Sequence, residues 1–182
     1  MDQEDIYSII AYVRSLEAIP SEIPASKADF PMNLIMRTLP HDGEPTRLPS
    51  TTDELTYGEY MTNAAGCYDC HTPSIKGQFI EGMGFVGGME FNLPAGITRS
   101  SNITPDETGI GDWTVDEFVQ CFKAFDRQDL ERIDFSKDFQ TPMPWSMYAG
   151  MSEDDLRAIF KYLKSLDPIE NEVQRYTAMA SE

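Results

Sequence analysis

Hydrophobic residues recur with helical spacing in four stretches of the chain. Residues 2–17 repeat apolar side chains at intervals of three and four, as one buried face of a helix requires. Residues 53–65, the segment after Thr114, and residues 151–166 have the same character. The third stretch opens with Thr114-Val-Asp-Glu117, a capping box that marks the start of a helix. The pattern therefore predicts a mainly helical protein.

The first and last helical stretches are copies of one pattern. Residues 1–19 align without gaps on residues 151–169. The identical positions include polar residues that a shared apolar stripe does not require, which indicates an internal repeat. We therefore expect residues 1–19 to resemble the last helix of a preceding domain of the same kind. The repeated residues are Met1, Asp5, Ile9, Tyr12, Ser15, Leu16 and Ile19, which recur as Met151, Asp155, Ile159, Tyr162, Ser165, Leu166 and Ile169.

The segments between the helical stretches are rich in proline and glycine. Residues 20–52 carry repeated prolines and no long periodic segment, and they are expected to form an extended linker. Residues 72–111 are rich in glycine and are expected to form long loops, with a short β-hairpin around residues 92–96. Residues 53–168 would then form one domain. The remaining residues, 169–182, are expected to be a polar tail.

Composition and charge narrow the classes of protein. With 41% hydrophobic residues among 182, the chain has enough apolar material for a core. Its formal net charge of −17 argues against nucleic acid as a partner, because phosphates would be repelled. The same charge suits steering toward a basic partner, and equally an ordinary solvated acidic surface. No run of about 18 apolar residues is present, so no membrane-spanning segment is expected.

The motif with the most specific chemistry is Cys67-Tyr68-Asp69-Cys70-His71. Two cysteines separated by two residues and followed at once by histidine are typical of c-type haem attachment. Each thiol adds to one vinyl group of the porphyrin, and the histidine then offers an imidazole nitrogen to the iron. We predict one haem c, bound covalently through Cys67 and Cys70, with His71 as an iron ligand.

Two other interpretations of this motif require more than the sequence offers. A structural zinc module needs further ligands, and His41 and Cys121 are the remaining candidates, neither of them in a second knuckle. A thioredoxin-type CxxC needs alternating strands and helices around it, which are missing. His41 fits a solvated turn, and Cys121 fits a small buried hydrophobic residue. The zinc module remains as an alternative.

A second iron ligand is expected late in the chain, at Met143. This methionine lies between two prolines, which stiffen the backbone and can hold a thioether in place. If Met143 is not on the iron, the distal site is open, and the protein is a peroxidase-like haem enzyme or sensor. No distal histidine with a partnering arginine is recognisable. The competing methionines are Met147 and Met151, then Met61, Met83 and Met89.

Taken together, these segments resemble a known family, the bacterial class I c-type cytochromes. The resemblance is to di-haem and multi-haem periplasmic cytochromes related to cytochrome subunits of membrane-bound dehydrogenases, and it covers residues 53–168. It implies an all-α, cytochrome c-like fold with few strands, axial ligation by His71 and Met143, and haem propionates held with help from Asn102 and Trp113. The matching segments are Asn63–Pro73, Asn102–Asp106, Thr108–Trp113, Met143–Trp145 and residues 151–166.

The expected function is that of a one-electron carrier and not of an enzyme, because imidazole and thioether together fill both axial positions of the iron. Expected partners are redox proteins, such as other cytochrome domains or a membrane-bound oxidoreductase complex. A periplasmic or other extracytoplasmic location follows from haem attachment of this type. Met1 is followed by Asp-Gln-Glu-Asp instead of a basic leader, so we expect residue 1 not to be the start of the precursor.

Overall fold

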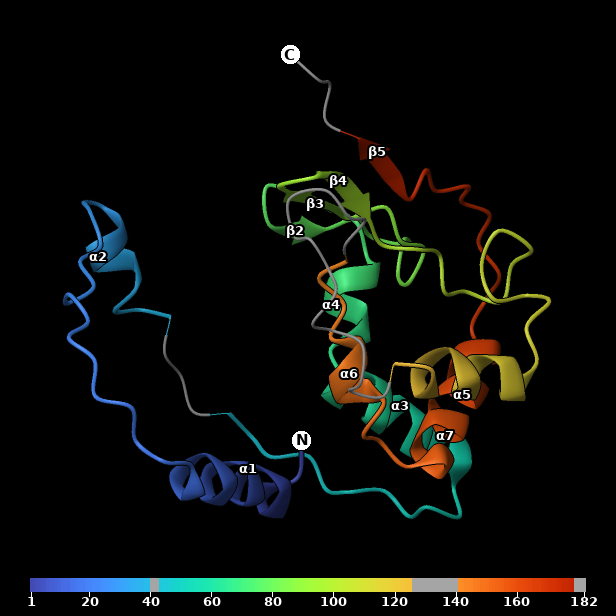
Figure 1. Ribbon diagram of the computed structural model, residues 1–182, viewed down its shortest axis with the longest axis horizontal. Helices are drawn as coiled ribbons and strands as arrows, with labels where there is room; N and C mark the ends of the chain where they lie inside the picture. Colours follow the sequence, from blue (N-terminus) through green and yellow to red (C-terminus); the bar gives the residue numbers. More distant parts are fainter. Residues whose placement is uncertain (40–42, 126–140, 179–182) are drawn as a thin grey trace. The chain divides into compact units, whose positions relative to one another are not determined.

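The computed structural model describes residues 1–39, 43–125 and 141–178 (Figure 1). The chain divides into two compact units, Met1–Leu48 and Pro49–Glu182. The first unit contains helix α1 (Gln3–Ser15) and the single turn α2 (Met32–Ile35). The prediction of a helix within residues 2–17 is confirmed. Its N-cap is Asp2, whose carboxylate accepts hydrogen bonds from the backbone N–H groups of Glu4 and Leu48, both at 2.9 Å.

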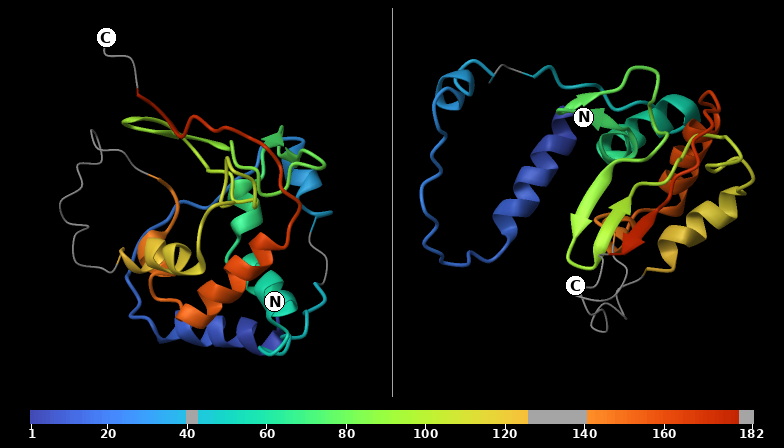
Figure 2. Two further views of the ribbon diagram at one scale, coloured as in Figure 1. Left: turned by 90° about the vertical axis from the view of Figure 1, so that its right-hand side faces the viewer. Right: turned by 90° about the horizontal axis from the view of Figure 1, so that it is seen from above.

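The second unit is built on three packed helices. These are α3 (Glu54–Ala64), α5 (Val115–Lys123) and α7 (Glu153–Lys164), and α7 packs along both of the others (Figure 2). All three confirm the helices expected from the sequence. The capping box at Thr114 is formed: its hydroxyl accepts from the Glu117 N–H, and the Glu117 carboxylate accepts from the Thr114 N–H at 2.8 Å. Two single turns, α4 (Cys67–His71) and α6 (Trp145–Tyr148), complete the helical part.

Within the residues that the structure describes, five short strands form two antiparallel sheets. Strands β1 (Ser74–Ile75) and β2 (Gln78–Phe79) make a hairpin, and β3 (Glu90–Leu93) and β4 (Gly96–Arg99) make another. The second hairpin was expected around residues 92–96, and it turns through Pro94 and Ala95. Strand β5 (Tyr176–Ala178) then pairs with the other edge of β4, which gives the sheet order β3-β4-β5.

The expectation of an all-α fold is therefore wrong. Strand β4 alternates buried and half-buried residues, as a strand covered on one face does, and its β-branched Ile97 and Thr98 suit that surface. The segment after α7 contributes β5, so a strand arises from polar sequence with little periodicity of its own. The core of the second unit is helical, and two small sheets lie outside that core in the described residues.

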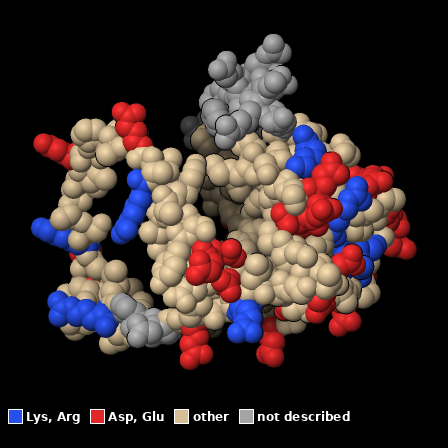
Figure 3. All heavy atoms as spheres, turned by 90° about the horizontal axis from the view of Figure 1, so that it is seen from below, with Lys and Arg blue, Asp and Glu red and all other residues tan. Residues whose placement is uncertain are grey.

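Charged side chains of both signs lie on the surface of the molecule. On the face drawn in Figure 3, Lys and Arg side chains lie among Asp and Glu side chains. Within the residues that the structure describes, no helix is both long enough and apolar enough to cross a bilayer.

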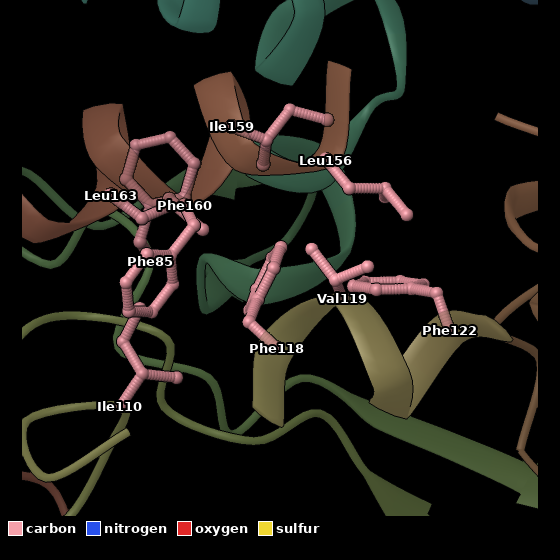
Figure 4. Close-up of a cluster of buried hydrophobic side chains, with 9 residues drawn as sticks. All are labelled: Phe85, Ile110, Phe118, Val119, Phe122, Leu156, Ile159, Phe160 and Leu163. Atoms are coloured by element: carbon pink, nitrogen blue, oxygen red, sulfur yellow. The ribbon is translucent and has the colours of Figure 1, made fainter. Parts of the chain in front are cut away.

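The hydrophobic core lies where α5 faces α7 (Figure 4). Helix α7 contributes Leu156 and Leu163, each 1% exposed, and burial of a leucine side chain stabilises a fold by about 1.5–3 kcal/mol. Loop residues Phe85 and Ile110 close the same cluster from the side. The full set of buried members is Phe85, Ile110, Phe118, Val119, Phe122, Leu156, Ile159, Phe160 and Leu163.

Candidate functional site

The cysteine motif forms one helical turn directly after α3. Gly66 lies between the two helices with φ of +68°, a left-handed conformation that glycine adopts at little cost, and this permits the tight turn into α4. Cys67 and Cys70 are three residues apart in that turn and therefore share one side of it. Both thiols are free. Burial raises the pKa of Cys67 to about 11, while Cys70 is exposed to solvent.

His71 is buried and held in one orientation. Its side chain is 9% exposed, and its Nδ1 lies 2.7 Å from the Ser101 carbonyl oxygen. Because a carbonyl only accepts, Nδ1 must carry the proton, and Nε2 keeps the lone pair that a metal requires. Burial lowers the pKa of His71, and the hydrogen bond to Ser101 opposes that shift. Both the neutral state and the tautomer thus suit ligation of iron.

The Ser101 carbonyl is positioned by the side chain of its neighbour, Asn102. The Asn102 side-chain oxygen accepts from the Thr104 N–H at 2.9 Å and from the Thr104 hydroxyl at 2.8 Å. Its amide nitrogen donates to the Thr108 hydroxyl and to the Ile169 carbonyl, both at 2.9 Å. Asn102 is 3% exposed, so these four bonds fix a buried loop. Its expected contact with a haem propionate remains a prediction, and it would require one of these amide bonds to open.

A glycine loop holds the other side of His71. The Gly87 N–H donates to the His71 carbonyl at 2.7 Å. Gly87 has φ of +74°, and a Cβ there would overlap the backbone of Ser100 and Ser101, so only glycine fits between the two segments. Just before it, Phe85 adopts φ of +64° while its N–H donates to the buried Thr72 hydroxyl at 3.2 Å. The glycines around residue 87 therefore serve close backbone packing beside the histidine.

Tyr148 was not identified from the sequence. Its hydroxyl donates to the Ala65 carbonyl at 2.6 Å, which ties α6 to the chain just before the cysteine motif. Burial, together with a smaller effect of the nearby Cys67 and Cys70, raises the pKa of Tyr148 to about 12. Ser101 and Gly87 contact His71, and Tyr148 contacts Ala65 just before the motif. Each contact joins residues far apart in the chain, and no spacing in the sequence signals it.

Met143 lies in a segment anchored to α5. Its side chain is partly buried against the hydrophobic core, and its N–H donates to the Thr141 hydroxyl at 3.2 Å. Two residues later, the Trp145 ring stacks on Phe125 with centroids 4.8 Å apart. Met147 is 75% exposed, so it is poorly placed for a buried site. Among the other candidates, Met61 and Met151 also pack against the core, and Met83 and Met89 are half-buried.

The remaining predicted residues lie in other surroundings or outside the described ranges. Trp113 is 39% exposed and lines a shallow hollow with Asp112, Glu117 and Cys121. The carboxylates of Asp112 and Glu117 in that hollow would repel a haem propionate. The expected contact of Trp113 with a propionate remains a prediction. Cys121 was expected to be buried and is half-buried, and this partial burial raises the pKa of its thiol. His41 lies outside the residues that the structure describes.

These residues fit a covalent haem. The site offers two free thiols on one helical turn and an adjacent buried imidazole with Nε2 available. For a zinc site, three or more His, Cys, Asp or Glu side chains should converge, and within residues 1–39, 43–125 and 141–178 no such group exists.

Comparison with known proteins gives a consistent result. The model of the family described as cytochrome c matches residues 56–167. The cytochrome c subunit of alcohol dehydrogenase (quinone) from Gluconobacter oxydans is 33% identical over 106 residues, 58% of this chain and 20% of that protein. The gluconate 2-dehydrogenase cytochrome c subunit from Pantoea cypripedii is 38% identical over 109 residues, covering 58% and 21%. The fructose dehydrogenase cytochrome subunit from Gluconobacter japonicus is 30% identical over 121 residues, covering 66% and 23%. The chain thus spans about a fifth of the length of these relatives.

Proposed function

Because the chain belongs to the cytochrome c family, we propose that its second unit carries a single haem c and acts as a one-electron carrier. Membership of the family implies covalent haem. We infer one haem because the sequence contains one CxxCH motif. The observation that carries the proposal is the buried His71, whose Nδ1 is engaged by Ser101 at 2.7 Å beside two free thiols.

His71 and Met143 are the proposed axial ligands of the iron. Haem supplies a metal that changes charge by one electron without a change of ligands. The Ser101 carbonyl keeps the imidazole in one tautomer, and this makes His71 a stronger donor. Trp145 packs on Phe122 of α5 and on Phe125, which holds the backbone around Met143 in place. The Met143 thioether would then reach the iron from a fixed position. With both positions filled, no substrate reaches the iron, which favours a carrier over an enzyme.

The proposed partner is a subunit of an oxidoreductase complex outside the cytoplasm. Three of the relatives are named as cytochrome subunits of dehydrogenases for alcohol, gluconate and fructose. Because the chain has a net charge of −17, its association rate should be higher with a partner that has a basic docking surface than with a neutral or acidic one. Electron transfer to such a partner is therefore expected to slow as ionic strength rises.

Substitution of Met143 tests the ligand assignment. Met143→Ala should lower the reduction potential, because a sulfur ligand favours the ferrous state, and it should open the iron to carbon monoxide. Met147→Ala is the matched control, since that side chain is 75% exposed and should change neither property. Redox titration and absorption spectra with and without carbon monoxide provide the readout.

The outcomes separate the carrier from its rival. If the Met143→Ala spectrum and potential match those of the parent, Met143 is not the ligand. If the parent protein itself binds carbon monoxide readily, the distal site is open, and the peroxidase-like enzyme or sensor is the better account.

A further inference from the structure

Helix α5 ends in a lysine that binds the loop between α6 and α7. Lys123 is the last residue of α5, and its ammonium group donates to the Ala149 carbonyl at 2.9 Å and to the Met151 carbonyl. The lysine is half-buried, and among the described residues the ion pairs of the second unit involve other cations. Hydrogen bonds from a charged donor are about twice as strong as neutral ones. Lys123 therefore fixes the backbone of this loop.

A second lysine makes the same arrangement at the end of α7. Lys164 is the last residue of that helix, and its ammonium group donates to the carbonyls of Ile110 and Gly111, just before α5 begins. Each helix of the α5–α7 pair thus holds the loop that leads into the other helix. The two lysines share their chemistry and differ in the loop that they hold, so the loop determines what each lysine does.

Hydrogen bonds continue from the loop at Lys123 to Met143. The Ala149 N–H donates to the Trp145 carbonyl at 2.8 Å, and the Trp145 N–H donates to the Met143 carbonyl at 2.9 Å. Three hydrogen bonds in series therefore connect the Lys123 ammonium group to the backbone of Met143. The residue before the lysine, Phe122, packs on the Trp145 ring with centroids 5.5 Å apart. The end of α5 thus holds α6 by a ring contact and by a charged hydrogen bond.

The loop at Lys164 leads to the other side of the site. The Ile110 N–H donates to the Thr104 carbonyl at 3.0 Å, and the Thr104 N–H donates to Asn102 in the loop behind His71. Within the part of the chain that the structure describes, no hydrogen bond joins residues 102–113 to residues 143–151. Lys164 is therefore a lysine of the same kind that has no connection to the thioether.

We propose that Lys123 is a positioning residue for the thioether of Met143, because it holds α6 so that the sulfur stays on the iron. The inference rests on the proposed ligation by Met143. An iron with both axial positions filled binds an external ligand only while one of its own ligands is displaced, so the apparent affinity follows the fraction of open protein. Loss of the Lys123 hydrogen bonds raises that fraction, since α6 then has fewer contacts that fix it.

Carbon monoxide binding to the reduced, haem-loaded full chain measures this fraction. Lys123→Met keeps an unbranched side chain of similar length without its donors, and it should raise the affinity for carbon monoxide by about tenfold. Lys123→Arg retains donors for both carbonyls and should stay within about twofold of the parent.

Lys164→Met is the matched control. It removes the same kind of hydrogen bonds, so it should lower the melting temperature about as much as Lys123→Met does. Its affinity for carbon monoxide should nevertheless stay within about twofold of the parent, because the loop at Lys164 is not linked to Met143. A merely structural role of Lys123 would not separate these two variants.

An unchanged carbon monoxide affinity in Lys123→Met would overturn the proposal. An equal rise in Lys164→Met would overturn it as well, because general destabilisation would then be the cause, and so would an equal rise in Lys123→Arg. If Lys123→Met yields no haem protein, Lys123→Gln keeps a shorter donor and should show a rise of about threefold against the same controls, with no rise contradicting the proposal.

Met143→Ala separates a failure of this inference from a failure of the ligand assignment. If Met143→Ala binds carbon monoxide no better than the parent, the assignment of Met143 fails, and the role of Lys123 fails with it. If Met143→Ala opens the iron and Lys123→Met does not, the role of Lys123 fails alone.

Discussion

His71 is held by a carbonyl group that is itself held by a buried amide. Ser101 accepts from the histidine, and Asn102 fixes Ser101 through four hydrogen bonds to Thr104, Thr108 and Ile169. Removal of a buried partner leaves polar groups unsatisfied, which costs about 1–3 kcal/mol for each group. The orientation of the proposed iron ligand therefore depends on a residue that does not contact the histidine ring.

Asn102→Ala should lower the free energy of unfolding by about 2 kcal/mol, because it leaves the buried Thr104 N–H without its acceptor and removes one of the two donors to the Ile169 carbonyl. It should also raise the reduction potential, since a loosened Ser101 carbonyl makes His71 a weaker donor to the iron. Urea unfolding and redox titration measure the two effects.

Asn92→Ala is the matched control for this substitution, because Asn92 is an exposed asparagine of β3. It should change stability by no more than about 0.5 kcal/mol and leave the potential unaltered. If Asn102→Ala behaves like this control, the hydrogen-bonded loop does not position His71.

The residues that sequence reasoning identified are those whose chemistry is local. Cys67, Cys70 and His71 share one helical turn, so their spacing is visible in the sequence. Ser101 lies 30 residues from His71, and it acts through a backbone carbonyl that any residue type would provide. Tyr148 reaches Ala65 across 83 residues, so nothing in its neighbourhood indicates the contact.

At the scale of elements, the haem domain depends on the crossing of α3 and α7. Gly58 permits the two backbones to meet, and it is the one position of α3 where a glycine interrupts the helix. Alanine would favour the helix by about 1 kcal/mol, but overpacking of a core costs about 1–3 kcal/mol. Because the overlap is with the Ala158 carbonyl and not with a mobile side chain, we expect the cost of overpacking to win.

Gly58→Ala should therefore destabilise the protein by about 2 kcal/mol, and Gly58→Val by more. Thermal and urea unfolding measure this loss. Gly43→Ala is the control, since a Cβ there meets no atom within 4 Å. A Gly58→Ala variant as stable as the parent would show that α3 and α7 do not cross so closely.

The helices were predictable because their signals lie within each segment. Thr114 and Glu117 form the capping box that their spacing indicated, and Ser152 caps α7. The sheets were less predictable, because strands need partners from elsewhere in the chain. Strand β5 has three residues and pairs with β4, some eighty residues away, so the all-α expectation missed it.

At the scale of the molecule, residues 169–178 follow α7 and bind the loops that hold His71. This segment is called the strap. The Ile169 carbonyl accepts from Asn102, and the Asn171 side chain donates to the Val86 carbonyl at 2.8 Å. Farther on, Arg99 donates to the Gln174 carbonyl at 3.1 Å, next to the pairing of β5 with β4. The strap joins the histidine loop, the glycine loop and the sheet into one body.

A chain that stops after Pro168 should lose about 3 kcal/mol of stability, because several partly buried hydrogen bonds lose a partner. The haem itself should stay attached through Cys67 and Cys70, but the iron should lose His71 as a ligand at a lower temperature, as the loop behind His71 loosens. A chain that stops after Ala178 retains the strap and should behave as the full chain does. Calorimetry of the three forms measures the difference, and equal melting temperatures would contradict the role of the strap.

The central claim is that one haem is bound covalently to this chain through Cys67 and Cys70. The most direct test measures iron and haem absorbance per chain after the protein has been unfolded and separated from free cofactor. The account predicts one haem for each polypeptide, still attached in the unfolded state and absent from a Cys67→Ser, Cys70→Ser double variant. A colourless protein, or colour that separates from the chain on unfolding, would contradict it.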